Sequence, residues 1–501
     1  MYISKDTKIL LFLILLRFVS VFLVQTAHVP DEYWQSLEVA HRLAFGYGYL
    51  TWEWTAKIRN CFYPFLISVI YRILGLLSLD YVSILTTLPR MIQAIISAYG
   101  EYRFYVWTRN KWTLYSLCIN WYWYYCATRT IINTLETSCT MIALSVFPWR
   151  DSNIKSLKFL WIVGLLCMMR PTAAVIWIPL CLYQFSTSLQ NELILVCKYG
   201  IIGGICIISS MLMDSLYYGT LVMSHWQFFR ANVLYHVGDF YGKEHLLWYL
   251  FSALPVLLGL HYILLLLGIW QIFKHPAQYH HQAILLTVIG WTIGVYSLLS
   301  HKEFRFLLPL LPMLLYISTS CIFHLNIRFS EMGRKIFIAL FIISNILPGL
   351  YFCLIHQRGS LDVMEVLHEE INNSNVNTTN ILFLTPCHAT PLYSHLHVNV
   401  STRILTCEPN FTSSMEQRSI YVNEVETFFQ NPMEWLDYNY MNNPNIALPS
   451  HIVLYENLLP RISKLMRNYQ IVVRLFYSHF PETNYGNYIY SQEGGYNDGN
   501  N

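Results

Sequence analysis

The sequence predicts an all-α polytopic membrane bundle of about 11 to 13 transmembrane helices, followed by a small C-terminal α+β domain. Of its 501 residues, 55% are hydrophobic and only 12% are charged, and the mean hydropathy is +0.37. Apolar runs of roughly 18 to 22 residues, about the length of a membrane-crossing helix, recur along the first 355 positions. We therefore expect a multi-spanning domain at 1–355 and a soluble domain at 356–501.

The first apolar run, Ile9–Val24, follows Lys5 and Lys8, as the apolar core of a secretory signal does. However, Arg17 interrupts this run, and the residues after it, 25–27, form a poor cleavage site. We interpret the run as a retained signal anchor with a cytosolic N-terminus.

The C-terminal part of the chain, after about residue 356, is rich in Asn, Ser, Thr, Pro and His. Short apolar stretches at 381–384 and 452–454 predict strands there. Acceptor sequons for N-glycosylation begin at Asn372, Asn377, Asn399 and Asn410 and are clustered in this part of the chain. Clustered sequons favour a luminal location for the whole domain.

The twelve cysteines contain no CxxC pair, and most lie in apolar runs, where cysteine packs as a small hydrophobic residue. Cys387 and Cys407 lie in the polar tail instead. An oxidising lumen would allow these two to form a disulfide, and the alternative is a pair of free thiols.

The orientation of the loops follows from a luminal tail. The last span, 336–354, is preceded by Arg334 and Lys335 and therefore begins in the cytosol. Alternation then places the loops at 300–305, 214–245 and 28–60 in the lumen. The loops rich in polar and aromatic residues thus face one compartment, in the membrane of the endoplasmic reticulum.

The middle of the chain does not fit simple alternation, because six candidate segments stand where an odd number of crossings is required. One of the six therefore does not span the membrane. Basic residues at 150–158 favour a cytosolic loop there, which places Thr128–Thr130 and Arg170 near luminal helix ends. The six segments are 62–79, 82–99, 112–127, 130–148, 157–169 and 171–184.

The loops assigned to the lumen contain carboxylates and cations, a combination that suits transfer of a sugar from a phosphate donor. A glycoside hydrolase needs two carboxyl groups, one of them to protonate the leaving group. A phosphate leaves without a proton. Such a transferase needs one carboxylate to accept the proton of the acceptor hydroxyl, and cations to stabilise the charge that grows on the phosphate.

The carboxylates follow the first span directly, at Asp31 and Glu32. We expect Asp31 to act as the base and Glu32 to position the acceptor. The alternative is structural, since an acidic pair solvates a helix end and Asp is a common N-cap residue. Polar and aromatic residues of the same loop favour the first interpretation, and those expected to contact the acceptor or its sugars are His28, Trp34, Trp52, Glu53 and Trp54, with Glu38 nearby.

The cations expected to bind the donor phosphate are His301, Lys302 and Arg305. The alternatives are interfacial snorkelling of the long side chains and pairing with Glu303. An arginine within an apolar segment is costly unless it has an anionic partner, which a lipid phosphate would supply. On this ground Arg129 is a further candidate for the phosphate, as are Arg17 and Arg170.

Metal ions, cofactors and nucleic acids are not expected. Cys387-His388 and His395-Leu396-His397 can be drawn as a metal site, but their spacing matches no strong zinc pattern, so packing or acceptor contact is the preferred interpretation. The net charge of +3 comes without a basic stripe, which argues against nucleic acid as a partner.

Several of these motifs together resemble the dolichol-phosphate-mannose-dependent mannosyltransferases, which have the multi-spanning C-type glycosyltransferase fold. Within that family, 357–364 and 386–391 resemble the branch that adds the third mannose in glycosylphosphatidylinositol (GPI) anchor synthesis. The motifs that carry the wider resemblance are 28–35, 49–54, 128–130 with 133–136, 170–173 and 301–306.

The resemblance implies an inverting enzyme whose partners are membrane lipids, the donor dolichol-phosphate-mannose and a GPI glycolipid intermediate as acceptor. The product is an α-1,2-linked mannose, and Asp31 and Glu32 match the catalytic acids of the family. One departure from the family pattern is Val29, which separates His28 from Pro30 and weakens the carry-over for His28.

Two alternatives differ in class. A sister mannosyltransferase acting on the lipid-linked N-glycan precursor would share the acidic and basic motifs, but the tail motifs argue against it. A transporter or scaffold is disfavoured, because the sequence has no repeated halves of the kind that many transporters carry.

Overall fold

The computed structural model describes residues 4–150, 157–188, 192–320, 322, 330–373, 376–410, 421–442, 446–480 and 488–494. The chain forms two compact units. Unit 1 comprises Met1–Leu23, Ala56–Leu66 and Thr87–Leu350, and unit 2 comprises Val24–Thr55, Ile67–Thr86 and Tyr351–Asn501. The predicted boundary after residue 355 therefore does not describe unit 2 fully, because two earlier segments, 24–55 and 67–86, pack with the C-terminal part of the chain.

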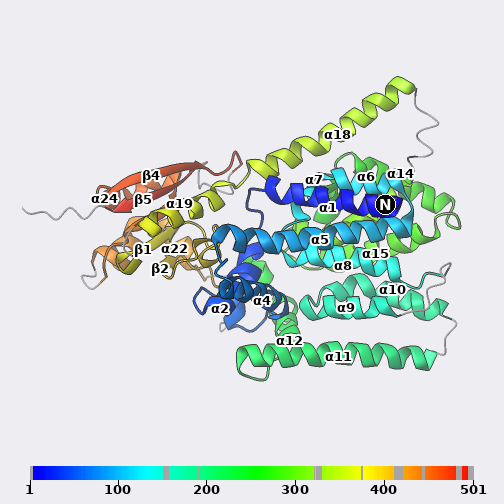
Figure 1. The fold of residues 1–501 in the computed structure, drawn as a ribbon, viewed down its shortest axis with the longest axis horizontal. Helices are drawn as coiled ribbons and strands as arrows, with labels where there is room; N and C mark the ends of the chain where they lie inside the picture. Colours follow the sequence, from blue (N-terminus) through cyan, green and yellow to red (C-terminus); the bar gives the residue numbers. More distant parts are fainter. Residues whose placement is uncertain are drawn as a thin grey trace, which may run out of the picture. The chain divides into compact units, whose positions relative to one another are not determined.

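The described residues of unit 1 form helices and their connecting loops (Figure 1). In chain order the helices are α1 (Lys5–Leu23), α5 (Val82–Thr108), α6 (Lys111–Ile119), α7 (Trp121–Cys126), α8 (Ile132–Val146), α9 (Lys158–Met169), α10 (Ala173–Thr187), α11 (Glu192–Tyr218), α12 (Ser224–Phe229), η2 (Arg230–Leu234), η3 (Val237–Tyr241), η4 (Tyr249–Ala253), α13 (Leu254–Leu258), α14 (His261–Lys274), α15 (His280–Ser297), η5 (Phe304–Leu310), α16 (Leu311–Thr319) and α18 (Glu331–Leu354). The last turn of α18 and the first turn of α5 belong to unit 2.

The apolar runs of the sequence are helical as expected, but several are shorter than the runs themselves. The segment predicted at 112–127 is two helices, because Asn120 ends α6 and its side-chain oxygen caps α7 by accepting a hydrogen bond from the Trp123 N–H at 2.9 Å. The Asn120 amide also donates to the Leu257 carbonyl at 3.0 Å, so the break is fixed by a partner elsewhere in unit 1.

By length and composition, two described helical stretches are long and apolar enough to cross a membrane, Glu192–Tyr218 and Glu331–Asn373. A third is reached if the bent pair Tyr249–Leu258 and His261–Lys274 is one span. Only long apolar helices of the described residues are counted here, so this number does not contradict the predicted total of about 11 to 13 transmembrane helices. Other predicted spans are shorter apolar helices, such as α9 and α10.

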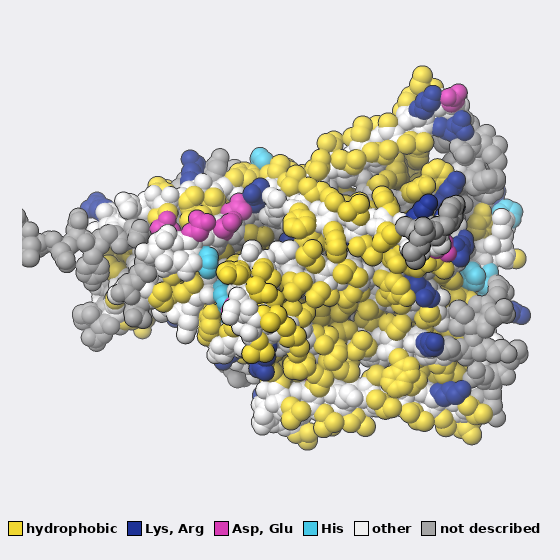
Figure 2. All heavy atoms as spheres, in the orientation of Figure 1, with side chains coloured by type: hydrophobic (Ala, Val, Ile, Leu, Met, Phe, Trp, Pro, Cys, Tyr) yellow, Lys and Arg dark blue, Asp and Glu magenta, His cyan; other side chains and the backbone are white. Residues whose placement is uncertain are grey.

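The outer faces of the long helices expose large apolar side chains, as a bilayer requires. On α11, Leu216 is 84% exposed and Leu193 is 70% exposed, and on α18 Leu347 is 63% exposed. Figure 2 shows hydrophobic side chains over much of the helical unit. An apolar surface of this extent fits contact with lipid and not with water.

Unit 2 contains helices from both ends of the chain. They are η1 (Tyr33–Leu37), α2 (Glu38–Phe45), α3 (Trp52–Thr55), α19 (Gly359–Asn373), η6 (Val376–Thr378), α20 (Tyr393–Leu396), α22 (Glu424–Gln430), α23 (Pro432–Leu436), η7 (Asp437–Met441), η8 (Glu456–Ile462) and α24 (Ser463–Met466). Helix α4 (Phe62–Leu76) begins in unit 1 and ends in unit 2.

A mixed sheet lies within unit 2, with strand order β2-β1-β3-β5-β4. β1 pairs in parallel with β2 and β3, and β5 is antiparallel to β3 and β4. The strands are β1 (Asn380–Leu384), β2 (Ser401–Ile404), β3 (His451–Tyr455), β4 (Tyr469–Phe476) and β5 (Tyr488–Gly494). The strands predicted at 381–384 and 452–454 are thus confirmed as β1 and β3, within the expected small α+β fold.

One hydrophobic core of unit 2 lies against alternate residues of β1 and β3, which point to the same face of a sheet. Leu382 and Leu384 of β1 and Ile452 and Leu454 of β3 pack there with residues of α22, α23, η8 and α24. The residues between them on both strands are buried as well, as expected for parallel strands covered on both faces. The sheet is therefore a firm base for the loops that leave its strands.

The end of α4 packs on α2 within unit 2. Arg72 donates to the Leu43 carbonyl at 2.8 Å, and Phe45 lies 3.5 Å from the position that a side chain on Gly75 would occupy. Asp80, in the turn after α4, lies 3.3 Å from His397 of the tail. The tip of this hairpin is thus part of the same unit as the first loop and the tail.

Candidate active site

Asp31 and Glu32 lie in the first turn of a helix that continues through η1 and α2. The Pro30 carbonyl accepts hydrogen bonds from the N–H groups of Tyr33 and Trp34, both at 3.0 Å, so Pro30 and not Asp31 is the N-cap residue. Glu32 is only 2% exposed, whereas Asp31 is partly exposed. Asp31 is therefore the member of the pair that a hydroxyl group reaches more easily, as a base requires.

The tryptophans of the same loop are packing residues in this structure. Trp34, Trp52 and Trp54 are 3%, 8% and 2% exposed, and the Trp54 indole N–H lies 3.4 Å from the Trp34 carbonyl. The expectation that they offer open planes to a sugar is corrected accordingly, because buried rings shape the loop from inside. Glu53 is held by Gln35, whose amide donates to it at 3.1 Å.

The helix that begins at Asp31 and ends at Phe45 is here called the acidic helix. The C-terminal tail, after residue 356, lies directly against it in unit 2. The ring of His388 packs on Trp34 with centroids 4.8 Å apart, and the Trp34 indole N–H donates to the Thr390 carbonyl at 3.2 Å. Burial lowers the pKa of His388 to about 4, and the charge of Asp31 acts in the opposite direction. Asp31 and His388 are therefore close enough to interact electrostatically.

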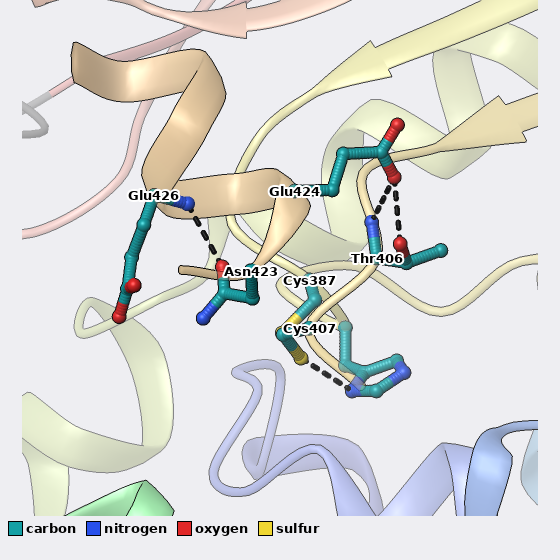
Figure 3. Close-up of a disulfide and its surroundings, with 7 residues drawn as sticks. Cys387, Thr406, Cys407, Asn423, Glu424 and Glu426 are labelled. Carbon is teal, nitrogen blue, oxygen red and sulfur yellow. Dashed lines mark hydrogen bonds between the residues drawn. A yellow bond between two sulfur atoms is a disulfide. The ribbon is translucent and has the colours of Figure 1, made fainter. Parts of the chain in front are cut away.

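Cys387 and Cys407 form a disulfide, with their Cα atoms 5.8 Å apart (Figure 3). Nδ1 of His388 lies 4.0 Å from the sulfur of Cys407. These three residues are close enough together to be considered as metal ligands. Cysteine binds metals as a thiolate, however, and sulfurs bonded to each other are not in that form.

The cations at 301–305 are organised around Glu303 in unit 1. Arg305 donates to the Glu303 carboxylate from Nε and Nη2, both at 2.6 Å, and His301 Nε2 lies 3.1 Å from it. Burial alone would raise the pKa of Glu303, but Arg305 and His301 outweigh it and hold this pKa well below its ordinary value. Pairing with Glu303, the alternative to a purely phosphate-binding role, is thus present.

Lys302 is held by backbone carbonyls. Its ammonium donates to Leu299 at 2.6 Å and to Glu244 at 3.1 Å, and the side chain is almost buried. An ammonium fixed in this way points in one direction and is not a snorkelling surface group. Its binding to a donor phosphate stays a prediction.

Arg129 lies in a buried polar region of unit 1. Its Nε donates to the Tyr125 carbonyl at 3.0 Å, and its guanidinium lies 4.1 Å from the centre of the Tyr125 ring. Asn133, at the start of α8, donates to the Arg305 carbonyl at 3.0 Å and so ties α8 to η5. Among the described residues, the hydroxyls of Thr128 and Thr130 are buried without a hydrogen-bond partner, which is costly unless a ligand satisfies them.

Arg17 and Arg170 have protein carboxylates as partners. Arg17 donates to Glu101 at 2.8 Å, and both side chains are fully buried. Arg170 lies 3.2 Å from Glu136. The expectation that a lipid phosphate neutralises Arg17 is corrected, because Glu101 already supplies the anion that a buried guanidinium needs.

The sequon asparagines differ in their surroundings. Asn399 is exposed, Asn410 is partly exposed, and the exposed Asn372 has its amide 2.9 Å from His368. The side chain of Asn377, and the residues Ser374, Phe411 and Thr412 of two other sequons, lie outside the described residues.

Unit 2 also has an open cavity of about 510 Å³, lined by Ala44, Phe45, Arg72, Gly75, Leu76 and Asp80. It contains no residue of the predicted site. The structure thus groups Asp31 and Trp34 with His388 in unit 2, and His301 with Arg305 and Asn133 in unit 1.

Sequence reasoning missed the roles of Glu38, His388 and Thr390. Their contacts join positions more than 350 apart in the chain, and no periodicity within either segment indicates such a pairing. The only available signal was the cluster of histidines at 388–397, which matched no metal pattern and for which packing or acceptor contact was the preferred interpretation.

Comparison with known proteins places the chain in a family. A "GPI mannosyltransferase 3" of Drosophila melanogaster is 42% identical over 476 residues, covering 94% of this chain and 84% of that protein. A "GPI alpha-1,2-mannosyltransferase 3" of Danio rerio is 39% identical over 493 residues, covering 96% and 89%. The crystal structure of ArnT from Cupriavidus metallidurans bound to undecaprenyl phosphate superposes with a TM-score of 0.57 at 11% identity, covering 97% of this chain and 98% of that one.

The likeness to ArnT shows that the fold is that of the C-type glycosyltransferases, with a multi-pass membrane unit. The model of the Alg9-like mannosyltransferase family matches residues 8–397, which is most of the chain and includes both the acidic helix and the 301–305 cluster. The chain therefore belongs to the Alg9-like mannosyltransferase family.

Proposed function

We propose that this mannosyltransferase adds the third mannose of the GPI anchor precursor, in α-1,2 linkage, with dolichol-phosphate-mannose as donor. The observation that carries the proposal is the identity of 42% and 39% to proteins named GPI mannosyltransferase 3, over 94% and 96% of the chain. The sister enzymes of the N-glycan precursor are not favoured by these matches.

The proposed reaction is a single displacement. A hydroxyl oxygen of the acceptor attacks the anomeric carbon of mannose, the bond from that carbon to the phosphate oxygen breaks, and the configuration inverts. The acceptor proton passes to the Asp31 carboxylate, while the electron pair of the broken bond stays on the phosphate. Asp31 suits this role because it is the partly exposed acid, and the buried Glu32 beside it shapes the approach of the acceptor.

The departing phosphate gains negative charge, which cations already fixed in orientation stabilise most effectively. Arg305 is fixed by Glu303, and Lys302 by two carbonyl groups. ArnT was crystallised with undecaprenyl phosphate bound, which supports a lipid phosphate as the donor class here. With such cations present we propose no cofactor beyond the lipid donor, so chelators should leave transfer unchanged.

We further propose that the N-terminus is cytosolic and that unit 2 lies in the lumen of the endoplasmic reticulum. Exposed basic residues such as Arg109 and Lys335 support this orientation, since positive charge favours the cytosolic side. On the face shown in Figure 2, Lys and Arg side chains gather where Figure 1 marks the N-terminus.

We infer that α4 is the segment that does not span, among the six that the alternation of loops left in doubt. Its last turn and the turn at Asp80 bond to α2 and to His397, which are both luminal in the proposed orientation. The next helix, α5, then crosses from lumen to cytosol. This removes the extra crossing from the predicted topology.

The test of the proposed function is rescue of cells that lack the third mannosyltransferase of GPI synthesis. Expression of the full chain is expected to restore surface display of GPI-anchored proteins and to elongate the accumulated acceptor by one α-1,2-mannose. Restoration of N-glycan precursor synthesis in cells lacking the sister enzymes, without restoration of anchors, would refute the proposed acceptor class.

A further inference from the structure

One face of the acidic helix carries side chains that bind a single segment of the tail, residues 388–397, here called the clamp. The positions involved are Trp34, Glu38 and His41, spaced four and then three residues apart, as on one face of a helix. Tyr33 adds an edge contact to the clamp, with its ring centre 5.2 Å from that of His395. The contacts therefore follow the helix from its first turn to its last.

Glu38 makes the densest of these contacts. Its Oε1 accepts hydrogen bonds from the Leu392 N–H at 2.7 Å, the Ser394 N–H at 3.0 Å and the Ser394 hydroxyl at 2.5 Å. The side chain is fully buried, and Oε2 has no hydrogen-bond partner among the described residues. Glu38 is thus occupied by the clamp and is not available to a sugar, which corrects its expected place among the sugar contacts.

The other end of the helix is bound as well. His41 Nε2 lies 2.9 Å from Nδ1 of His397, and His397 Nε2 lies 3.3 Å from Asp80. At the first turn, Trp34 meets both His388 and the Thr390 carbonyl. The helix is held at both ends and in its middle, so neither rotation nor sliding along its axis is possible without breaking buried hydrogen bonds.

The clamp is itself anchored to the sheet. It follows β1, whose residues pair with both β2 and β3, and the disulfide from Cys387 to Cys407 ties its start to the segment after β2. The Tyr393 hydroxyl donates to the Val400 carbonyl at 2.7 Å and closes the turn that leads into β2. A rigid support therefore extends from the sheet through the clamp to the helix that begins with Asp31.

We propose that the clamp is a positioning element for the carboxylates of Asp31 and Glu32, and that Glu38 is its central anchor. A base must lie within hydrogen-bonding reach of the proton that it removes, and a displacement of about 1 Å costs about 100-fold in rate. The family match ends at His397, the last residue of the clamp, so what the family shares includes this segment of the polar tail. The inference rests on the proposed function, in which Asp31 and Glu32 are the reacting acids.

The experiment compares Glu38→Ala and Glu38→Gln in the full-length enzyme, reconstituted in lipid, by measuring kcat and the KM for dolichol-phosphate-mannose. Gln keeps a carbonyl oxygen where Oε1 accepts its three bonds, whereas Ala removes that acceptor and leaves the Leu392 and Ser394 N–H groups without it. We expect Glu38→Ala to lower kcat by about 10- to 100-fold with little change in KM, since the donor site is not altered. Glu38→Gln is expected to keep most of kcat.

The matched control is Glu424→Ala. Glu424 is also a carboxylate that collects a backbone N–H and a hydroxyl, from Thr406 at 2.8 and 2.7 Å, in the same unit and beside the disulfide (Figure 3). Its loss should lower the melting temperature of the protein and leave kcat near that of the wild type.

An unchanged kcat in folded Glu38→Ala, or an equal fall of kcat in Glu424→Ala, would overturn the inference. If Glu38→Ala does not accumulate, Trp34→Phe is the second test, because it removes the indole N–H that binds Thr390 together with part of the ring that packs on His388. A lowered kcat in Trp34→Phe supports the clamp, and a wild-type value contradicts it. Asp31→Asn, assayed in parallel, separates the two hypotheses, since its retained activity refutes the proposed function whatever the Glu38 variants show.

Discussion

Arg305 meets Glu303 through two of its nitrogens, each 2.6 Å from a carboxylate oxygen. This two-point contact fixes the plane of the guanidinium, which a single hydrogen bond does not. His301 approaches the same carboxylate at 3.1 Å. The cluster is therefore ordered before a donor binds, and the Glu303 carboxylate neutralises part of its positive charge.

The Arg305–Glu303 pair allows stability and catalysis to be separated. Arg305→Gln should lower the melting temperature, because it leaves the Glu303 carboxylate without its main partner. The double variant Arg305→Gln with Glu303→Gln should recover much of that loss, since the uncompensated charge is gone. Mannose transfer should fall by about 100-fold in both variants if Arg305 stabilises the departing phosphate. Transfer that recovers together with stability would show that Arg305 has only a structural role.

His41 predicts a pH dependence of stability. Burial, with a smaller effect from His397, lowers its pKa to about 3, against about 6.5 in an unfolded chain. Below pH 6.5 the unfolded state therefore binds more protons than the folded state, so the free energy of unfolding decreases as the pH is lowered. From pH 7.5 to pH 5.0 this group should cost about 2 kcal/mol. Thermal unfolding of His41→Gln should show a smaller loss of stability from pH 7.5 to pH 5.0 than the wild type. An equal loss in both proteins would contradict the attribution of this pH dependence to His41.

Arg17 and Glu101 test whether a buried arginine of α1 serves the protein or the donor. Replacing either residue alone leaves a buried charge, which should destabilise the protein by about 3 to 5 kcal/mol. The pair Arg17→Met with Glu101→Leu should be close to wild type in both stability and transfer. If the pair folds normally but its KM for the donor rises more than tenfold, Arg17 binds the donor after all.

The sequons test the proposed orientation. Asn399 is exposed and is expected to carry a glycan if unit 2 is luminal. Treatment of the protein from cells with an endoglycosidase should increase its gel mobility, and Asn399→Gln should remove part of that shift. The control is a sequon introduced in the loop at 109–111, which should stay unmodified on the cytosolic side. Glycosylation of the introduced sequon, together with an unmodified Asn399, would show that the topology is the reverse of the one proposed.

Much of the fold was predictable from the sequence because hydrophobic length and periodicity act locally. The runs that became α1, α5, α8 to α10 and α18 are visible as apolar stretches, and β1 and β3 as short apolar segments in a polar tail. The number of spans was harder to predict, because α4, which we propose does not span, is an apolar helix like the spans, and its contact with Leu43 of α2 is not visible in its own sequence.

The site was predictable only in part. Asp31, Glu32 and the cations at 301–305 stand out as charges beside apolar runs, where charge is costly. What these residues touch was not predictable: Glu101 is 84 positions from Arg17, and Ser394 is 356 positions from Glu38. The tryptophans of the first loop suggested sugar contacts by residue type alone, and only burial shows that they pack inside the loop.

Asp31→Asn tests the central claim most directly. The isosteric amide cannot accept the proton of the acceptor hydroxyl, so transfer from dolichol-phosphate-mannose should fall by at least about 100-fold, at unchanged melting temperature. Asp437→Asn, which alters a carboxylate that faces Lys464 in the same unit, is the matched control and should transfer normally. The measurement is single-turnover transfer by the purified full chain in lipid. A near wild-type rate for Asp31→Asn would contradict the assignment of Asp31 as the base, whereas a loss confined to this variant is the result predicted here.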